Sequence, residues 1–244
     1  MNVPASFHPL NRHLTVLKGG PGSEREVSLR SGAAVAAALL LAGARVDEVE
    51  VISTEVHVPE GTELVFNLIH GTFGEDGGLQ AVLGERGIPY TGEGEEESRI
   101  AFDKILTKKA LESAGVPTPR SEILRAGEIP SIPLPIVIKA PRQGSSVGVH
   151  LIHDAAEIAP ALADCLLHGE EILVEELVIG RELTVGVLGD QVLPVVEIKP
   201  NEGFYDYTNK YSYANNYIVS NGYQNADQNS NGYANQYSNG YDIV

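Results

Sequence analysis

The stretch KAPRQGSSVGV, residues 139–149, decides the fold of the central part of the chain. It joins two predicted strands, at 134–140 and 149–153, and the first strand delivers Lys139 to a loop rich in glycine and serine. Glycines permit unusual dihedral angles, so several N–H groups and two hydroxyls can face one anion. Lys139 adds a point charge suited to a phosphate, although it precedes the glycines and the stretch is therefore not a Walker motif. From this stretch alone, a plain hairpin with a surface lysine is an equal alternative.

Around this loop the sequence predicts a small α+β domain over about residues 117–200. A helix is expected at 155–167, and further strands are expected at 171–178, 182–188 and 191–198. Short strands with a single helix among them indicate an antiparallel sheet with a helix on one face.

The preceding residues alternate between strands and helices joined by short glycine loops, which indicates a parallel α/β domain over about residues 14–95. Its strands are expected at 13–18, 45–52 and 64–69, and its helices at 27–42 and 79–86. Residues 96–116 are predicted to be a helical linker, with one helix over 98–114. The predicted fold class is therefore α/β, with two domains.

Composition excludes several classes of protein. The 244 residues carry 33 acidic and 17 basic side chains, and the net charge of −16 opposes a nucleic-acid partner. Cys165 is the only cysteine and cannot form an internal disulfide. The apolar runs are shorter than a membrane span, and the start lacks the apolar core of a signal peptide. We expect a soluble cytoplasmic protein without a membrane partner.

Several charged side chains follow the parallel strands at their carboxyl ends, where ligands bind in open α/β sheets. Glu24 is expected to face that cleft, where a carboxylate suits a substrate ammonium, whereas Glu26 is expected to cap the first helix. His70 follows a strand at the same edge, which favours a binding role. Glu75 and Asp76 are expected to cap the next helix.

Taken in order, seven segments resemble the D-alanine–D-alanine ligase family of ATP-grasp enzymes over about residues 14–211. They are GGPGSEREVSLRSG, NLIHGTFGEDGGLQ, IPYTGEG, DK, IKAPRQGSSVGV, ILVEELVIGRELTVGVLG and FYDYTNKY. The resemblance implies an N-terminal pre-ATP-grasp α/β domain and an α+β ATP-grasp central domain. It also implies an activity: ATP phosphorylates one D-alanine carboxylate, and the amine of a second D-alanine attacks the acyl phosphate to give a dipeptide for peptidoglycan. The implied cofactors are ATP and Mg²⁺, and the family implies a homodimer.

The resemblance also implies roles for residues at matching positions. Glu24, Ser145 and Tyr211 resemble the catalytic set, in which Glu24 holds the ammonium of the first D-alanine and Ser145 links it to Tyr211. His70 and Lys210 resemble further substrate-binding residues. The residues that resemble the ATP site are Lys104, Lys139, Ser145, Ser146 and Val147 at the phosphates, Glu175, Glu176, Leu177 and Val178 at the adenine, and Glu182 at the ribose. Because depsipeptide-forming relatives have histidine where Tyr211 stands, a D-alanine amine is the implied nucleophile.

Beyond Tyr211 the composition changes. Residues 201–211 resemble the start of the family's substrate-covering loop, and residues 212–244 are rich in Asn, Tyr, Ser and Gly. We expect a disordered low-complexity tail in place of the C-terminal ATP-grasp half. The family's magnesium ligands lie in that half, so no metal ligand is expected here and catalysis is expected to be absent or very low. The alternatives are a non-catalytic binder of ATP or D-alanine, and a protein that self-associates through its Tyr/Asn-rich tail.

Overall fold

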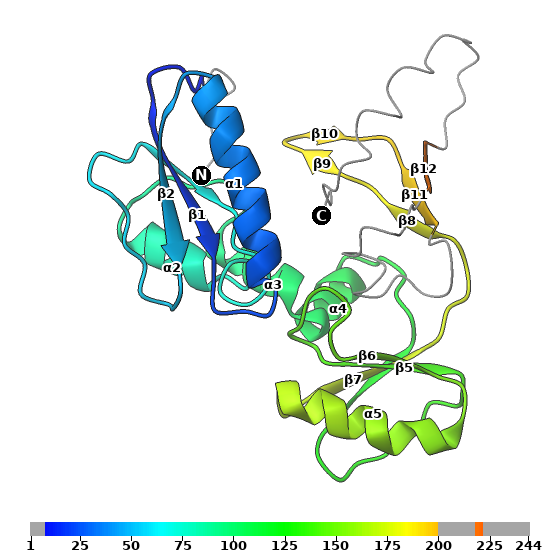
Figure 1. The fold of residues 1–244 in the computed structure, drawn as a ribbon. Helices are drawn as coiled ribbons and strands as arrows, with labels where there is room; N and C mark the ends of the chain where they lie inside the picture. Colours follow the sequence, from blue (N-terminus) through cyan, green and yellow to red (C-terminus); the bar gives the residue numbers. More distant parts are fainter. Residues whose placement is uncertain (1–7, 200–217, 222–244) are drawn as a thin grey trace, which may run out of the picture. The chain divides into compact units, whose positions relative to one another are not determined.

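The computed structural model describes residues 8–199 and 218–221 (Figure 1). The chain divides into two compact units after Leu177. The first unit contains the predicted α/β domain, the linker and the glycine loop. Within the described part of the chain, no helix is long and apolar enough to cross a membrane.

The first unit begins with a three-stranded parallel sheet, as predicted. β1 (His13–Gly19) is its central strand and pairs with β2 (Arg45–Val51) on one side and with β3 (Leu64–Asn67) on the other. The carboxyl ends of β1 and β3 therefore lie at the same edge of the sheet. The loops that follow these two strands, residues 20–24 and 68–77, start at that edge.

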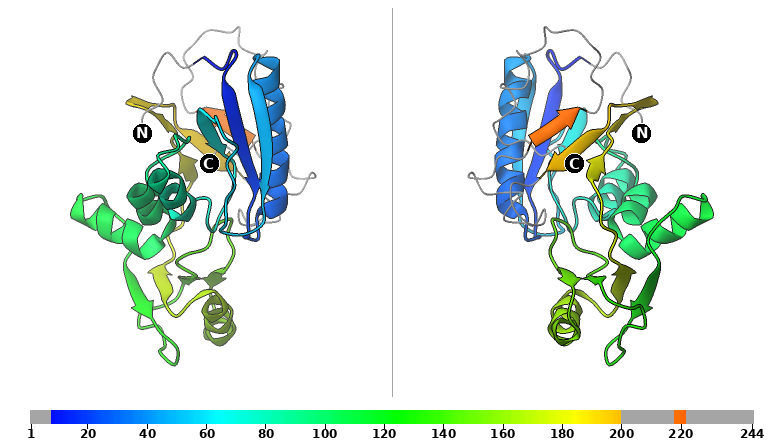
Figure 2. Two further views of the ribbon diagram at one scale, coloured as in Figure 1. Left: turned by 90° about the vertical axis from the view of Figure 1, so that its left-hand side faces the viewer. Right: turned by 90° about the vertical axis from the view of Figure 1, so that its right-hand side faces the viewer.

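The two faces of this sheet are covered by α1 (Arg25–Leu41) and α2 (Gly78–Glu85) (Figure 2). Successive residues of a strand point to opposite faces. Leu64 accordingly packs in a cluster with Leu39 of α1, whereas its neighbour Val65 packs with Leu79 of α2. Both helices start directly after the loops at the carboxyl edge, so their first residues lie next to the predicted cleft.

The linker contains two helices, and the prediction of a single helix there is wrong. α3 (Glu95–Phe102) ends at Asp103, whose backbone is extended with φ −84° and ψ 106°, and α4 (Lys104–Ser113) begins at the next residue. The Asp103 carboxylate accepts hydrogen bonds from the N–H groups of Ile105 at 2.9 Å and Leu106 at 3.3 Å. Aspartate is a favoured helix cap, so it starts a new helix where apolar spacing predicted continuation.

The central sheet is antiparallel, as predicted, with the strand order β4-β7-β5-β6. Its strands are β4 (Ser121–Leu124), β5 (Ile136–Lys139), β6 (Val149–Ile152) and β7 (Ile172–Glu176). The short strand β4 was not predicted. The glycine loop connects β5 to β6, the two strands that the sequence placed on either side of it.

One helix covers one face of the central sheet, as predicted. α5 (Ile158–Cys165) is extended by the 3₁₀ turns η1 (Ala155–Glu157) and η2 (Leu166–His168), and its residue Cys165 is fully buried. Cys165 packs with Ile138 and other apolar residues of β4 to β7. The opposite face carries the charged residues of the candidate site.

The second unit consists of short antiparallel strands. β8 (Glu182–Thr184), β11 (Val196–Lys199) and β12 (Ile218–Asn221) form one sheet, and β9 (Val187–Leu188) pairs with β10 (Gln191–Val192). Each of the two strands predicted at 182–188 and 191–198 is therefore split in two. β12 lies within the predicted disordered tail, so that prediction is wrong for these four residues. The rest of the tail lies outside the described residues.

Candidate functional site

The glycine loop starts at Lys139, the last residue of β5. Ser145 and Ser146 both have positive φ, 48° and 60°, which is uncommon for residues other than glycine. The N–H of Val147 donates to the carbonyl of Gly144 at 3.0 Å and closes a tight turn around the two serines. Successive N–H groups in such turns form concavities suited to anions. The phosphate role of these residues stays a prediction.

Lys139 forms an ion pair with Glu175 on the neighbouring strand β7. In the antiparallel register Lys139 lies opposite Leu173, and Glu175 lies opposite Val137, so the two charged residues are diagonal neighbours on one face of the sheet. Glu175 is only 5% exposed, and its second carboxylate oxygen accepts a hydrogen bond from Lys108 Nζ at 2.7 Å. A buried carboxylate therefore lies between two ammonium groups.

Lys108 comes from α4, and all three of its N–H bonds have partners. Besides Glu175, it donates to the hydroxyl of Thr118 and to the carbonyl of Pro119, each at 2.7 Å. Burial by itself would raise the pKa of the Glu175 carboxyl, but hydrogen bonds from Lys108 and Lys139 outweigh burial and hold that pKa below its ordinary value of 4.5. Glu175 is thus ionised at neutral pH. Its predicted contact with adenine stays a prediction.

Lys104, the first residue of α4, contacts the entry of the glycine loop. Its backbone N–H donates to the carbonyl of Pro141 at 3.1 Å, and its ammonium donates to the carbonyl of Gln143 at 2.6 Å. The two lysines predicted at the phosphates are therefore brought to the same loop. Lys139 lies at the start of the loop, and Lys104 is held against its first half.

Glu24 lies directly before α1, yet its carboxylate does not cap the helix. It accepts a hydrogen bond from the hydroxyl of Ser145, 121 residues away, and Glu24 is only 6% exposed. Two glycines make room for this carboxylate. A Cβ at Gly144 would lie 3.0 Å from Glu24 Oε2, and one at Gly71, where φ is +65°, would collide with the same oxygen. Glu24 and Ser145, two of the three predicted catalytic residues, therefore lie in contact, and the role of Glu24 in a substrate cleft stays a prediction.

His70 lies in the loop after β3 with a partner at each ring nitrogen. Nε2 is 3.0 Å from the hydroxyl of Ser31 in α1, and Nδ1 is 3.5 Å from a carboxylate oxygen of Glu75. The prediction that Glu75 caps the next helix is therefore not met. Asp76 does act at that helix start, because it accepts a hydrogen bond from the N–H of Gly78 at 2.9 Å.

Glu176 and Leu177, the other predicted residues of the first unit, contact residues outside the glycine loop. The Glu176 carboxylate accepts the N–H of Arg120 at 3.1 Å, and the N–H of Leu177 donates to the carbonyl of Pro135 at 3.1 Å. Val178 and Glu182 belong to the second unit, where Glu182 is the exposed first residue of β8. The predicted residues Lys210 and Tyr211 lie outside the described part of the chain.

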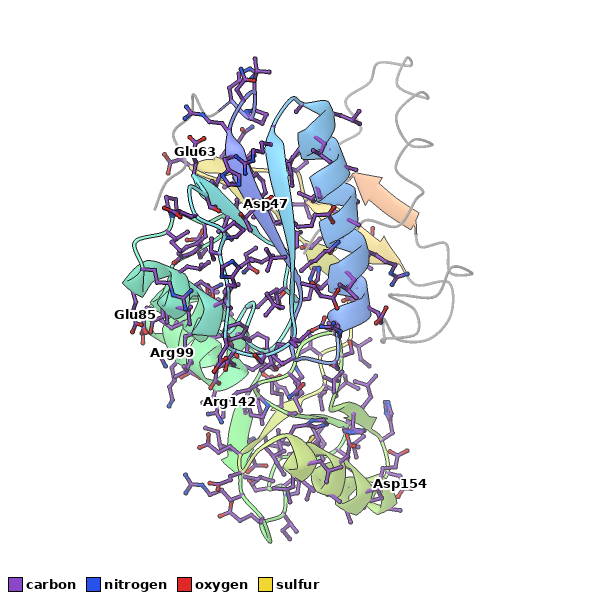
Figure 3. All side chains as sticks on the ribbon, turned by 60° about the vertical axis from the view of Figure 1, so that its left-hand side comes forward. Asp47, Glu63, Glu85, Arg99, Arg142 and Asp154 are labelled. Atoms are coloured by element: carbon purple, nitrogen blue, oxygen red, sulfur yellow. The ribbon has the colours of Figure 1, made fainter. Side chains whose placement is uncertain are left out.

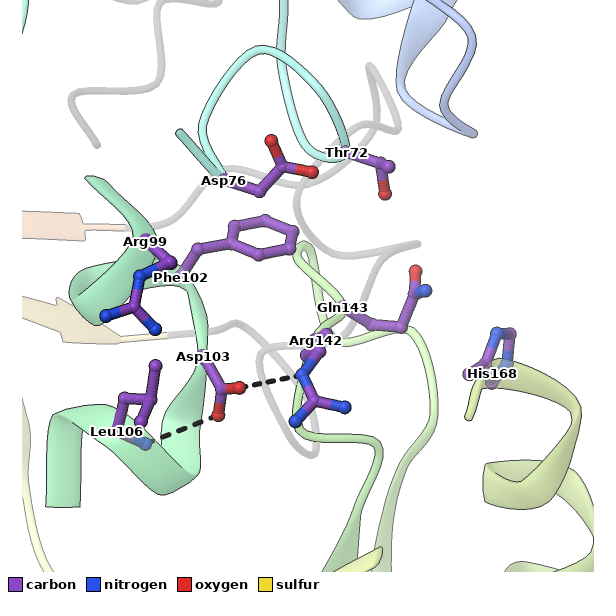
Figure 4. A pocket seen from close by; sticks show the side chains of 9 residues that line it. All are labelled: Thr72, Asp76, Arg99, Phe102, Asp103, Leu106, Arg142, Gln143 and His168. Carbon is purple, nitrogen blue, oxygen red and sulfur yellow. Dashed lines mark hydrogen bonds and ion pairs between the residues drawn. The ribbon is translucent and has the colours of Figure 1, made fainter. Parts of the chain in front are cut away.

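A pocket of about 500 Å³ adjoins the first half of the glycine loop (Figure 4). Its lining consists of Thr72, Asp76, Arg99, Phe102, Asp103, Leu106, Arg142, Gln143 and His168. An ion pair between Arg142 Nε and Asp103, at 2.7 Å, lies within this lining. Among residues 8–199 and 218–221, no group of three or more His, Cys, Asp or Glu side chains could hold a metal ion, so no residue is assigned to Mg²⁺.

Sequence reasoning missed Lys108, Arg142 and Ser31. Lys108 lies four residues after Lys104 on the same helix, and this spacing places both ammonium groups on one face, which was a usable signal. Arg142 lies inside the quoted loop motif but looks like an ordinary surface arginine in sequence. Ser31 lies one turn after Val27 in α1, and nothing in the sequence indicates its contact with His70.

Comparisons with known proteins show which family this chain resembles. The family model described as "D-ala D-ala ligase C-terminus" matches residues 107–237, a range that runs past Tyr211 into the predicted tail. The chain is 46% identical over 204 residues to a D-alanine–D-alanine ligase of Methylacidiphilum infernorum, and the match covers 83% of this chain and 67% of that protein. It is 41% identical over 208 residues to the protein of the same name from Syntrophotalea carbinolica, with coverages of 82% and 68%.

Solved structures give the same result. D-alanyl-alanine synthetase A from Vibrio cholerae superimposes with a TM-score of 0.73 at 28% identity, over 89% of this chain and 76% of that chain. The D-alanine–D-alanine ligase from Bacillus anthracis complexed with ATP also has a TM-score of 0.73, at 27% identity, over 86% of this chain and 71% of that chain.

Proposed function

Because the chain belongs to the D-alanine–D-alanine ligase family, we propose that its described residues bind ATP and D-alanine for the ATP-dependent joining of two D-alanine molecules. ATP, when bound, supplies the phosphoryl group that activates one D-alanine carboxylate for attack by the amine of the second. The product would be the dipeptide used in peptidoglycan. Such chemistry needs alignment and charge neutralisation more than a covalent nucleophile of the protein.

The observation that carries this proposal is the convergence of three segments on the glycine loop. Lys139 begins the loop, Lys104 donates to its Gln143 carbonyl from 39 residues away, and Glu24 accepts from its Ser145 hydroxyl from 121 residues away. Two cations and a carboxylate at one loop suit a phosphate and an ammonium respectively. A plain hairpin with a surface lysine would need none of these contacts.

We assign the roles as follows. The Glu24 carboxylate accepts the ammonium of the first D-alanine, and His70, fixed by Ser31 and Glu75, lies near the substrate carboxylate. The two lysines and the N–H groups at 145–147 hold the nucleotide phosphates. Further proposed contacts come from Glu175, Glu176, Leu177 and Val178 to the adenine, from Glu182 to the ribose, and from Lys210 and Tyr211 to the substrate.

Magnesium, the oligomer and the compartment are separate proposals. Mg²⁺ would accompany ATP, but the described residues contain no fitting group of metal ligands, and no step is assigned to the ion. A homodimer in the cytoplasm fits the family, and sedimentation of the purified chain would test the dimer. These proposals do not affect the roles of the residues above.

The test combines binding with turnover. Calorimetry should show that the chain binds ATP in the presence of MgCl₂, and any ADP that forms, even at the very low rate expected from the sequence, should require D-alanine and not L-alanine. Glu24→Gln should weaken the response to D-alanine by about tenfold, because a charged hydrogen-bond partner is lost, while ATP affinity stays unchanged. The control is Arg12→Ala, which removes an exposed ion pair with Glu63 (2.6 Å) beside the N-terminal sheet.

Each outcome has a distinct meaning. ATP binding without any D-alanine-dependent ADP would favour the non-catalytic binder. A chain that binds neither ATP nor D-alanine contradicts the proposed function.

A further inference from the structure

We propose that the Asp103–Arg142 ion pair is a positioning latch that holds residues 141–143 of the glycine loop against the start of α4, so that Lys104 and the serine half of the loop face the same phosphate. The inference rests on the proposed function and deepens it. It assigns a role to two residues that do not themselves touch the ligand. Figure 4 shows the pair among the residues that line the pocket, with Asp103 also accepting a hydrogen bond from the backbone N–H of Leu106.

The Asp103 carboxylate makes two kinds of contact. One carboxylate oxygen caps α4 through the N–H groups of Ile105 and Leu106, and the other accepts Nε of Arg142 at 2.7 Å. Asp103 itself is only 6% exposed, whereas the Arg142 side chain that it holds is half-exposed to water. The helix start and the loop are thus connected through one carboxylate.

Residues 103 and 104 contact three consecutive residues of the loop. Asp103 holds the Arg142 side chain, the N–H of Lys104 donates to the carbonyl of Pro141, and the Lys104 ammonium donates to the carbonyl of Gln143. Movement of the loop entry would therefore change the position of the Lys104 ammonium as well. Beyond Gln143 the contacts change, because Ser145 turns toward Glu24.

The other edge of the Arg142 guanidinium, at Nη2, contacts a residue next to the central sheet. Its Nη2 donates at 2.9 Å to Glu171, which directly precedes β7, the strand that carries Glu175 and pairs with β5. A guanidinium presents its donors in a rigid fork, so two carboxylates on two edges determine its orientation. The latch thus links the helix of Lys104 to the sheet of Lys139.

Because Arg142 is exposed, the ion pair should contribute more to the position of the loop than to the stability of the fold. The Arg142 side chain is 51% exposed, and exposed ion pairs contribute little to folding. Loss of the pair should therefore leave the fold intact and loosen the geometry of the loop. A purely structural pair would lower the melting temperature and weaken the binding of all ligands alike.

The first measurement compares ATP with adenosine, which lacks phosphates, by calorimetry. Arg142→Ala and Asp103→Asn should each weaken ATP binding by about tenfold and leave adenosine binding and the melting temperature unchanged, because misplaced charged donors lose their hydrogen bonds. Asn keeps an oxygen that can cap α4, so Asp103→Asn removes the charge without removing the cap. Arg142→Lys keeps the charge but not the fork and should restore only part of the affinity.

The Asp103 variant separates positioning from a direct contact. If Arg142 bound the phosphate itself, freeing it from Asp103 would leave ATP affinity unchanged or improved, and that result would overturn the latch. Equal losses for ATP and adenosine would overturn it as well. Arg12→Ala, a loss of an exposed arginine from an ion pair elsewhere, is the matched control and should change nothing. Its partner Glu63 and the loop residue Arg142 are labelled in Figure 3.

The second measurement needs no ligand. Amide hydrogen exchange at Lys104 and at residues 140–148 should become faster in Asp103→Asn and Arg142→Ala, while exchange in β1 stays as in the wild type. Unchanged exchange at the loop would overturn the latch. If the wild type binds no ATP but exchange responds as expected, the proposed function fails while the mechanical link between helix and loop stands.

Discussion

Two ionic networks hold the candidate site, one inside the central sheet and one at its surface. The buried network consists of Lys108, Glu175 and Lys139, whose side chains are 9%, 7% and 26% exposed. Removing one member leaves an uncompensated charge away from water, which is strongly destabilising. The buried network should therefore govern whether the central sheet folds.

The surface network consists of Asp103, Arg142 and Glu171, with Arg142 51% exposed and Glu171 27% exposed. Water screens these charges, so their contribution to folding is small. Lys139, in the buried network, is itself predicted to bind phosphate. Asp103, in the surface network, directly precedes Lys104, which is also predicted to do so. The comparison indicates that, within one site, the buried network should determine the stability of the sheet and the exposed network the position of the loop.

The largest expected effect is on stability. Glu175→Ala should lower the free energy of unfolding by about 3 kcal/mol, because Lys108 stays buried without its carboxylate partner. Lys139 contributes less to this loss, since its side chain is partly exposed to water. Arg142→Ala should lower it by less than about 1 kcal/mol. Urea denaturation of both variants measures the difference. If Glu175→Ala does not fold, Lys108→Met, which leaves Glu175 with one partner, should still be less stable than Arg142→Ala. Equal losses would remove the distinction between the networks.

A second effect concerns access to the core beneath the sheet. Burial, with a smaller contribution from Asp164, raises the pKa of the Cys165 thiol to about 11, so at pH 8 only about one molecule in a thousand has the reactive thiolate. Labelling by a thiol reagent should therefore be slow and limited by opening of the central sheet. Glu175→Ala should speed labelling at least about tenfold, and Arg142→Ala less than about twofold. Rapid labelling of the wild type would show that the core is open.

A smaller effect is a pH dependence. The folded-state pKa of Glu175 lies below its ordinary value of 4.5, because hydrogen bonds from both lysines outweigh burial. Its stabilising contribution is therefore present above about pH 4.5 and is lost as the pH falls through the folded pKa. Unfolding curves from pH 7 to pH 3 should show a steeper loss in the wild type than in Glu175→Gln. The pKa of Glu122 is also lowered, but Glu122 is present in both proteins, so its effect is the same in the two curves. Parallel curves would contradict the assigned pKa direction.

Much of this arrangement could be predicted from sequence. Apart from β4, the strands of the first unit and the loop from Lys139 to Val149 followed from apolar periodicity and glycine positions, which are local properties. The break at Asp103 could not be predicted, because the apolar spacing continues through it and its partner Arg142 is distant in sequence. The two-residue strands of the second unit were equally hidden, since such short segments carry no period.

The site itself could be predicted only in part. The position of Glu24 at the loop side of α1 suggested a cleft, but its contact with Ser145 depends on how two domains meet. The spacing of Lys108 from Lys104 indicates only that the two share a helix face, and the fold is needed to show that Lys108 is buried against Glu175. Tertiary contacts of this kind leave no local pattern in the chain.

The most direct test of the central claim, that the glycine loop and its two lysines bind nucleotide phosphates, is calorimetric titration with ATP and adenosine. The wild type should bind ATP at least about tenfold more tightly than adenosine, because charged hydrogen bonds to the phosphates add to the affinity. Lys139→Ala, in which Glu175 keeps Lys108 as its partner, should remove most of that difference and leave adenosine binding unchanged when it is titrated at a temperature where the variant is folded. Equal affinities for ATP and adenosine in the wild type, or an unaltered ratio in Lys139→Ala, would contradict the account.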